Sequence, residues 1–513
     1  MAEALASTNP SENPIEQSSA VHKEGLPDFL PQRPRVHRGC EKHGYSPLES
    51  EDDYWVDAAA IRGEIPADLQ GTLFQTCVGR NEIGGQQFGH WFDGDGVINA
   101  VTFTAGKVHF RNRYVRTEKY LRESEAQRIL YRGVGTQIPG GMLRNMFRTP
   151  GNAANTSVIL HGGKLLALWE GGKPYELNPA TLETVGEYNF NGALKMGQPF
   201  SAHARLDPRS GNLYNFGVFG VPKPKLHLYA IDPAGRMVLN RSHYVGEYSM
   251  LHDFAITERY AVFVLCPAFM RRPFRFLFGL SSIMESIDFD ASEKAKIVVL
   301  DLHSGDIVTS CELDSFFGFH LGNAREAGDR LSVDVLCVAD MEVMGALADV
   351  YQESSDDADF LADGAQFIRF HLDLVNGDVH REPVAGAIPG EFPAWNLSRT
   401  GADNRFTWLA TIVENGTPYG FNACQKVDHV SGELRLHDYG EGRFTSEINF
   451  IPRAGATEED DGYLVSIVYN RERRKSEIVL VDARDMQHEL AVIALPTHIP
   501  FGFHGNFYTE TYR

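Results

Sequence analysis

Four histidines in apolar surroundings are the residues of this chain whose type and spacing suggest chemistry. They are His203, His252, His320 and His504, spread over about 300 residues. A single histidine in such a setting is more often a hydrogen-bonded core residue than a ligand. Neutral imidazole nevertheless binds divalent iron, copper, zinc or nickel, and four imidazoles leave one or two positions of an octahedral ion open for reaction. A shared metal ion is therefore our hypothesis.

Three glutamates could complete such a site. Glu391 and Glu447 have apolar neighbours, and Glu170 directly follows the apolar run at 165–169. A metal-binding histidine usually donates its second N–H to a carboxylate, which fixes the tautomer and strengthens the donor. For each glutamate alone, an exposed carboxylate at a strand end remains the alternative. Beside four histidines, the three carboxylates indicate partners of the metal-binding rings.

The elements that must position these residues form a loose repeat. From about residue 160, an apolar strand is followed by a short turn led by Asp or Asn, a second strand, and then a marked histidine or glutamate. The marked residue follows the turn residue by 18 to 25 positions, and successive marked residues are 49 to 71 positions apart. This spacing suits propeller blades of about 40–50 residues with insertions. The repeat predicts an all-β protein, a β-propeller whose marked residues converge on its axis.

The chain is long for one compact core, and a closed propeller would account for its length. Residues 1–45 are rich in Ser, Glu, Asn, Pro and Arg, and we expect them to form a mobile arm. We expect residues 46–513 to form a single propeller domain. Segments between blades at about 133–155, 266–295 and 342–365 are long enough to cover one face, where function would lie.

Composition excludes several classes of protein. A net charge of −20 argues against a nucleic-acid-binding protein, which needs a basic face. The six cysteines form no Cys-x-x-Cys pair and no signal peptide is evident, which indicates reduced thiols in a cytoplasmic protein. No apolar stretch approaches the roughly 18–20 residues that a membrane-spanning helix needs.

Two segments suggest peripheral contact with a membrane. Residues 138–148 and 267–278 both mix large apolar side chains with arginine, on an otherwise acidic protein. Such segments suit the interface of an anionic bilayer. Ordinary helices that pack their apolar faces on the propeller are the alternative, and both interpretations remain open.

Six motifs occur in order along nearly the whole chain. They are Trp91-Phe92-Asp93-Gly94-Asp95-Gly96, Leu165-Leu166-Ala167-Leu168-Trp169-Glu170-Gly171-Gly172, Ser201-Ala202-His203, Leu251-His252-Asp253-Phe254-Ala255-Ile256-Thr257, Phe319-His320-Leu321-Gly322-Asn323-Ala324 and Phe503-His504-Gly505. Together they resemble the motifs of the carotenoid cleavage oxygenases, most closely of the bacterial branch that cleaves apocarotenoids. The resemblance covers roughly residues 50–513.

This resemblance implies a seven-bladed β-propeller with a dome of helices and loops over one face. It also implies one Fe(II) per chain, held on the axis by the four histidines, with the three glutamates hydrogen-bonded around them. By the same resemblance, Thr156 would place its methyl group beside an open position of the iron. Phe92, Trp169 and Phe319 would line the channel for the polyene.

The activity that the resemblance implies is cleavage of a conjugated C=C bond of an apocarotenoid or carotenoid with O2, giving two carbonyl products. The partners would be an apolar polyene and O2, with a membrane surface as the source of the polyene. The bond cleaved, the chain length and end group of the substrate, and the oligomeric state stay open.

Three alternatives remain. Some relatives cleave stilbenes with an added Lys and Tyr, whose positions fall at Trp169 and near Val134 here, so stilbene cleavage is less favoured. A propeller hydrolase such as a lactonase would bind calcium or zinc through Asp and Asn, and a non-catalytic scaffold would bind no redox metal. Only an oxygenase predicts about one iron per chain.

Overall fold

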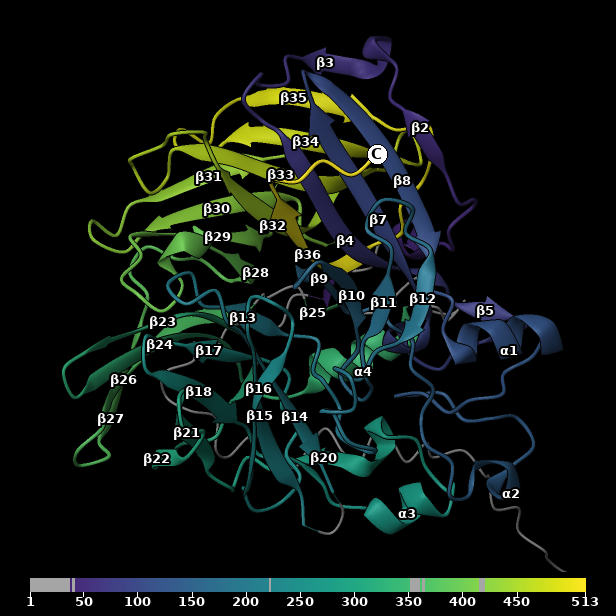
Figure 1. The fold of residues 1–513 in the computed structure, drawn as a ribbon, viewed down its shortest axis with the longest axis vertical. Coiled ribbons are helices and arrows are strands. Elements are labelled where there is room, and N and C mark those ends of the chain that lie inside the picture. The colour runs from purple at the N-terminus through teal and green to yellow at the C-terminus, as the bar shows by residue number, and fades with distance from the viewer. Residues whose placement is uncertain (1–36, 39–41, 221–222, 351–359, 362–364, 415–419) are drawn as a thin grey trace, which may run out of the picture.

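Seven antiparallel sheets of four or five strands surround a common axis (Figure 1). The computed structural model describes residues 37–38, 42–220, 223–350, 360–361, 365–414 and 420–513. The predicted seven-bladed β-propeller is therefore confirmed. Most of the predicted mobile arm, residues 1–45, lies outside the described residues, as does most of the 351–364 part of the third predicted insertion.

Five blades consist of four strands that follow one another along the chain, the first strand in each lying innermost. The first two are β9 (Ser157–His161), β10 (Lys164–Leu168), β11 (Tyr175–Leu177), β12 (Thr184–Glu187), and β13 (Ala204–Leu206), β14 (Leu213–Phe219), β15 (Lys225–Ile231), β16 (Met237–Tyr244). The next three are β17 (Phe254–Ile256), β18 (Tyr260–Leu265), β21 (Ala295–Asp301), β22 (Ile307–Leu313), then β23 (Phe317–Ala327), β24 (Arg330–Val338), β26 (Gln366–Asp373), β27 (Val379–Pro383), and β28 (Gly390–Ala394), β29 (Phe406–Thr411), β30 (Ala423–Asp428), β31 (Leu434–Asp438).

The other two blades combine both ends of the chain. One contains β32 (Arg443–Pro452), β33 (Gly462–Asn470), β34 (Lys475–Asp482) and β35 (Glu489–Ala494), with β3 (Ile61–Gly63) as an added outer strand. The last has the C-terminal β36 (Gly502–Tyr508) as its inner strand, next to the N-terminal β4 (Gly71–Arg80), β7 (Asp95–Thr104), β8 (Lys107–Tyr114) and β2 (Asp53–Trp55). This pairing closes the ring.

The position of a strand in its blade explains its sequence. Strands β18 and β21 lie in the middle of a blade, where neighbouring blades cover both faces, and they are nearly continuous apolar runs. The outermost strand β16 alternates between half-buried and exposed residues over its first half instead. Hydrophobic cores lie between blades, and one of them combines side chains of β18, β21, β23, β24 and β26.

The four α-helices lie in insertions between strands and are labelled in the lower right part of Figure 1. They are α1 (Glu118–Ala126), α2 (Met142–Asn145), α3 (Pro273–Leu277) and α4 (Glu342–Asp349), with η1 (Lys42–Tyr45), η2 (Ala58–Ala60), η3 (Trp91–Asp93), η4 (Met284–Ser286) and η6 (Leu397–Arg399) as short 3-10 turns. Three two-stranded sheets complete the fold: β1 (His37–Arg38) with β25 (Phe360–Leu361), β5 (Glu82–Ile83) with β6 (Gln86–Gln87), and β19 (Ala268–Met270) with β20 (Ile287–Phe289).

One buried arginine joins two of these insertions. The guanidinium of Arg132 donates to the carbonyl oxygens of Asn145 and Arg148 in the first insertion, at 3.3 Å each. It also donates to those of Phe276 and Ser281 in the second, at 2.8 and 2.7 Å. Because a buried guanidinium needs acceptors for its N–H groups, these four carbonyls fix the two insertions to each other.

Five cysteines lie in the described part of the chain. Cys77, Cys266, Cys311, Cys337 and Cys424 are all free and buried. Among the described helices, none is long and apolar enough to span a bilayer.

Candidate metal centre

Local irregularities of the inner strands turn the marked side chains toward the axis. In β23 the pairing with β24 shifts between Gly318 and Leu321, on either side of His320. The same happens in β36 between Gly502 and Gly505, on either side of His504. Bulges commonly redirect a side chain next to a functional site. His203 and His252 reach the axis differently, because they lie just before the short inner strands β13 and β17.

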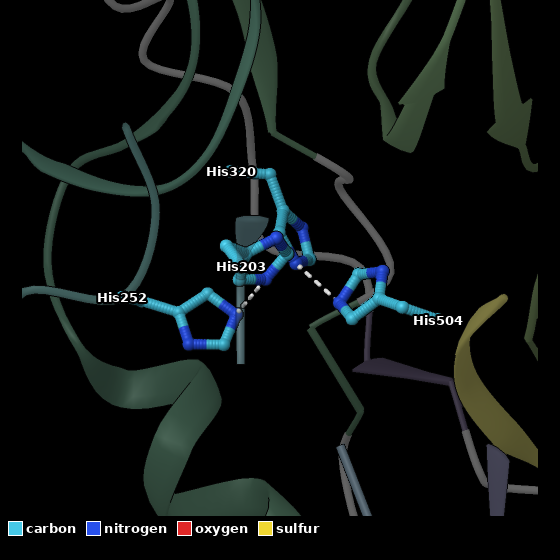
Figure 2. Close-up of side chains that lie close together, drawn as sticks. All are labelled: His203, His252, His320 and His504. Carbon is cyan, nitrogen blue, oxygen red and sulfur yellow. Dashed lines mark hydrogen bonds between the residues drawn. The ribbon is translucent and has the colours of Figure 1, made fainter. Parts of the chain in front are cut away.

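The four histidines meet at one point (Figure 2). One ring nitrogen of each lies within 4.8 Å of those of the other three, and all four residues are buried. Nε2 of His203 is 2.9 Å from Nε2 of His252, and Nε2 of His320 is 3.2 Å from Nε2 of His504. The structure thus brings together all four residues that the sequence singled out.

Three of the histidines contact the three predicted glutamates through Nδ1. The distances are 2.8 Å from His252 to Glu170, 2.6 Å from His320 to Glu391 and 2.8 Å from His504 to Glu447. In His320 and His504 the Nδ1–H donates a hydrogen bond to the carboxylate, so Nε2 of the same ring carries a lone pair. Lone pairs that face one another at about 3 Å repel, and a cation between them removes that repulsion.

The donor set therefore fits a divalent transition metal. All the converging atoms are imidazole nitrogens, which suit iron, copper, zinc or nickel rather than calcium or magnesium. Burial and the neighbouring imidazoles hold the pKa of His203 and of His252 well below the usual value for histidine. Those two rings are consequently neutral at pH 7, as a metal ligand must be.

Two other residues of the site, His320 and Glu170, have raised pKa values. Burial lowers the pKa of His320, but the carboxylates of Glu391, Asp253 and Glu447 together outweigh burial and raise it overall. A more basic ring is a stronger donor to a metal. Burial also raises the pKa of Glu170 to about 8, although a hydrogen bond from Ser201 opposes this rise.

A large cavity extends from the histidines to exposed residues such as Phe274. Its volume is about 1100 Å³, and its lining is mainly apolar. Three of the four histidines line it: His252, His320 and His504. The four predicted channel residues line it as well: Phe92, Thr156, Trp169 and Phe319. Phe319 stacks on the His252 ring with 3.7 Å between ring centroids, so the cavity wall lies directly against the metal centre.

Two further residues of the site were not found by the sequence repeat. Thr156 immediately precedes β9, the inner strand of the seventh blade, and so takes the position that a histidine or glutamate holds in the other six. Threonine is no usual metal ligand, and the insertion with α1 and α2 separates it from the preceding turn. Asp253 has an oxygen 3.5 Å from Nδ1 of His203, the one histidine without a glutamate partner at that atom.

Comparison with known proteins agrees with this arrangement. The family model described as RPE65, retinal pigment epithelial membrane protein, matches residues 45–509. Apocarotenoid-15,15'-oxygenase from Synechocystis sp. is 33% identical over 474 residues, which cover 90% of this chain and 95% of that protein. Lignostilbene-alpha,beta-dioxygenase isozyme III from Sphingomonas paucimobilis is 29% identical over 482 residues, covering 90% and 95%.

Solved structures lead to the same group of proteins. The crystal structure of cobalt-substituted Synechocystis ACO superposes with a TM-score of 0.83 at 32% sequence identity. The match covers 92% of this chain and 100% of that one. The likeness therefore extends over the whole propeller.

Proposed function

This chain belongs to the family of RPE65 and the carotenoid cleavage oxygenases, and on that premise we propose that it is an Fe(II)-dependent oxygenase, with one iron per chain. It would split one conjugated C=C bond of a carotenoid or apocarotenoid with O2 and release two carbonyl products. The observation that carries this proposal is the set of four Nε2 atoms facing one point at the wall of a large apolar cavity.

The residues around the cluster would hold the iron and prepare it for O2. Iron bound there would supply the activation of O2. Glu391 and Glu447 would keep the protons on Nδ1 of their rings and balance part of the charge that the all-imidazole ligand set leaves uncompensated. Glu170, whose pKa burial raises to about 8, would add its negative charge when the positive ion favours its ionised form. The apolar wall, with Phe92 and Phe319 as part of it, would hold one double bond of the polyene near the metal and exclude water. Bond choice would follow from how far the chain threads before its end group stops.

Carotenoid cleavage is favoured over stilbene cleavage by the lining of the cavity. Trp169, at the position of the Lys of the stilbene-cleaving branch, and Val134, near the position of its Tyr, both line it. Neither side chain can anchor a phenol by a charged or hydroxyl contact. A cavity of about 1100 Å³ also exceeds the usual size of a small-molecule site and suits a long polyene.

The hydrolase and scaffold alternatives predict different metal contents. A lactonase site would need carboxylate and amide oxygens on the axis, whereas the potential ligand group found in the described part of the chain contains imidazoles only. Elemental analysis of the purified protein should give about one iron per chain. Calcium or zinc would favour the hydrolase, and no metal would favour the scaffold.

Substitution of one ligand tests the proposed activity. We expect His252→Ala to lose bound iron and polyene cleavage together, because three imidazoles cannot enclose the ion as four do. The measurements are iron content and the aldehydes formed in air from a panel of apocarotenals, carotenes and stilbenes, identified by mass. His437→Ala removes an equally buried histidine of β31 and should keep both properties. Full turnover by His252→Ala would contradict the proposal.

We also propose that a surface of the two insertions docks on an anionic membrane, from which the polyene enters. This docking surface comprises the exposed apolar residues Met142, Leu143, Phe147, Phe274, Leu277, Phe278 and Leu280, with the exposed arginines Arg144, Arg148 and Arg275 among them. Leu143 is 79% exposed and Phe274 71%. A contiguous apolar surface with basic residues suits the interface of an anionic bilayer.

The two predicted membrane segments form this surface jointly. The backbone N–H of Phe147 donates to the carbonyl of Leu277 at 2.8 Å, and the rings of Phe147 and Phe278 meet edge to face with 5.4 Å between centroids. Phe274 and Leu277 also line the cavity that reaches the histidines. The same side chains would thus contact the lipid and the entrance of the channel.

Charge placed on the docking surface should block membrane binding. We expect the double variant Leu143→Glu with Phe147→Glu, at two exposed side chains that do not line the cavity, to lose binding to phosphatidylcholine vesicles with 30% phosphatidylserine, measured by sedimentation, while turnover of detergent-dissolved substrate is retained. The control is Val375→Glu with Val430→Glu, because those side chains are 77% and 78% exposed but lie in the 374–377 and 429–432 turns of outer strands. Equal vesicle binding by the two double variants would disprove the docking surface.

A further inference from the structure

His203 differs from the other three histidines in its carboxylate partner. Its Nδ1 lies 3.5 Å from Oδ1 of Asp253, whereas the other three rings have glutamate oxygens at 2.6 to 2.8 Å. The Asp253 side chain is only 1% exposed. A buried carboxylate is stable only when other groups donate to it. The groups that donate hydrogen bonds to Asp253 show which segments of the chain it joins.

Three groups donate to the Asp253 carboxylate. Nη2 of Arg205 lies 2.8 Å from Oδ1 and 2.7 Å from Oδ2. The backbone N–H of Phe254 donates to Oδ1 at 2.7 Å, and that of Leu321 donates to Oδ2 at 2.8 Å. Leu321 follows His320 in the next blade, so the carboxylate joins the segments that carry two different histidines.

Arg205 extends the same connection to further blades. It lies in β13, two residues after His203. Its Nε donates to the carbonyl of Phe254 at 2.8 Å and its Nη2 to the carbonyl of Leu321 at 3.0 Å. Its guanidinium lies over the ring of Trp395, 5.2 Å from the centroid, just beyond β28. One buried ion pair therefore joins the backbone beside three histidines and touches a fourth blade.

We propose that Asp253 and Arg205 are positioning residues of the metal centre, which orient the His203 ring and fix the blades of His203, His252 and His320 at the spacing that one ion requires. This inference rests on the proposed function. Both carboxylate oxygens are bound, so Asp253 cannot rotate away from His203. Arg205 carries the compensating charge, so the pair orients the ligands without adding net charge next to the ion.

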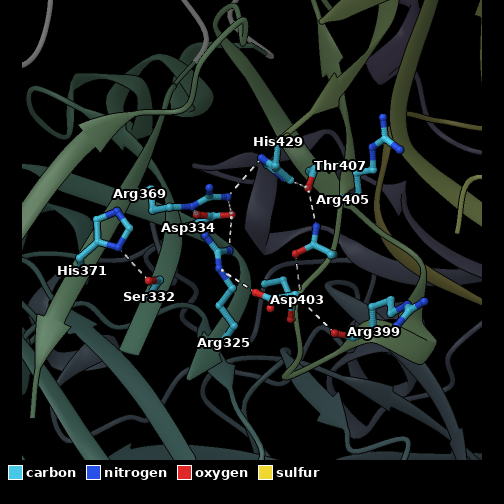
Figure 3. Close-up of polar contacts among 12 residues, drawn as sticks. Arg325, Ser332, Asp334, Arg369, His371, Arg399, Asp403, Arg405, Thr407 and His429 are labelled. Atoms are coloured by element: carbon cyan, nitrogen blue, oxygen red, sulfur yellow. Dashed lines mark hydrogen bonds and ion pairs between the residues drawn. The ribbon is translucent and has the colours of Figure 1, made fainter. Parts of the chain in front are cut away.

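The chain provides a matched control for this pair (Figure 3). Asp334 is also 1% exposed, and Arg369 binds both of its oxygens, at 2.6 and 2.9 Å. That pair joins β24 to β26 within one blade and contacts Arg325 and His429 rather than the metal-binding histidines. Substitution there perturbs a buried ion pair of the same kind without a direct contact to the metal centre.

The test compares Asp253→Asn with Asp334→Asn in the full chain. Asparagine keeps the size of the side chain but loses its charge and one acceptor oxygen. We expect Asp253→Asn to weaken cobalt(II) binding by about 10- to 100-fold in chelator competition, and to change the visible absorption of the bound cobalt. Asp334→Asn should lower the melting temperature of the metal-free protein, yet leave the cobalt affinity within threefold and the absorption unchanged.

A conservative variant covers the case in which Asp253→Asn does not fold. Arg205→Lys keeps the positive charge, but its single nitrogen cannot replace both Nη2, which binds Asp253, and Nε, which binds the carbonyl of Phe254. We therefore expect a smaller loss of affinity with the same change in absorption. Wild-type affinity and absorption in Arg205→Lys, or in a folded Asp253→Asn, would overturn the inference, as would an equal loss in Asp334→Asn. Wild-type protein that binds no metal at all would instead overturn the proposed function.

Discussion

Which nitrogen of each histidine carries the proton decides whether the cluster can hold a metal ion. His252, His320 and His504 each have a glutamate oxygen at Nδ1, which leaves Nε2 free to bind. If a glutamate were lost, the proton could move to Nε2 and oppose metal binding. The glutamates therefore matter although none of them faces the point where the four Nε2 atoms meet.

Glu447→Gln should keep the fold but weaken metal binding. Glu447 accepts from Nδ1 of His504 at 2.8 Å and from the backbone N–H of Gly505 at 2.5 Å. Glutamine has one acceptor oxygen, so its NH2 group must face one of these two donors. We expect about a 10- to 100-fold loss of metal affinity, measured by iron retention during dialysis against a chelator.

The control for this variant is Glu459→Gln. Glu459 also accepts from two N–H groups, here the backbone N–H groups of Arg405 and Phe406, away from the four converging histidines. It should change stability without changing iron retention. Iron retention by Glu447→Gln equal to that of the wild type would show that the His504 tautomer does not depend on this carboxylate.

The residues of the site differ in how far the sequence could predict them. The histidines and Glu391 and Glu447 were predictable because a histidine or a glutamate recurs at one place in the repeat. Thr156 takes the same place in the seventh blade, but its type gives no sign of metal chemistry. Asp253 was hidden for another reason, since its role depends on Arg205 and Leu321, whose proximity arises only when separate blades come together.

At the scale of the strands, side-chain hydrogen bonds join neighbouring blades in addition to the apolar cores between them. His429 lies between two blades: its Nδ1 is 3.1 Å from Nη2 of Arg369 in β26, and its Nε2 is 2.8 Å from Oγ1 of Thr407 in β29 (Figure 3). Because arginine can only donate, Nδ1 must accept and the proton must reside on Nε2. Protonation of Nδ1 would break the bond between the blades.

This arrangement makes the contact between the two blades sensitive to acid. Burial, with the arginines nearby, lowers the pKa of His429 to about 4, compared with about 6.5 in the unfolded chain. Between these values the unfolded state binds the extra proton, so the free energy of unfolding falls as the pH drops from 6.5 to 4. The contribution is on the order of 1–3 kcal/mol, and it is constant above about pH 7.

His429→Gln should reduce this loss of stability. Glutamine can accept from Arg369 and donate to Thr407 but does not titrate in this range. We expect a smaller fall in melting temperature between pH 7 and pH 5 than in the wild type, measured by differential scanning fluorimetry. His488→Gln, at a histidine whose side chain is 76% exposed, should leave the fall unchanged. An identical fall in His429→Gln and the wild type would exclude this histidine as its source.

The strands show a similar limit of prediction. Turn residues such as Asp232 and Asp301 mark the end of the third strand of a blade, so the repeat correctly identified the crossing to the next inner strand. The bulges beside His320 and His504 were not predictable, because they depend on the register with the neighbouring strand. The repeat located His504 but did not predict that its strand, β36, completes a blade with the N-terminal strands β4, β7, β8 and β2, since these strands are not consecutive with β36 in sequence.

At the scale of the whole molecule, the blade formed by β36 with β4, β7, β8 and β2 makes the metal centre depend on closure of the propeller ring. Strand β36 pairs with β4 from Gly505 opposite Gln75 to Tyr508 opposite Thr72. Closure holds His504 in place and also joins the two ends of the chain, so the C-terminal segment has both a structural and a ligand role. A single substitution can separate the two roles, because it removes the ligand and leaves the strand.

Deletion of residues 502–513 should therefore lower the free energy of unfolding more than loss of the His504 ligand does. His504→Ala removes one imidazole but keeps β36, and we expect it to lose metal while melting like the metal-free wild type. The truncated chain also loses the backbone hydrogen bonds of β36 and the packing of Phe503, which is 6% exposed. We expect it to be destabilised by more than about 5 kcal/mol relative to His504→Ala, or not to fold. Melting temperature and the rate of proteolysis measure the difference, and equal values for the two proteins would mean that the propeller remains closed without its last strand.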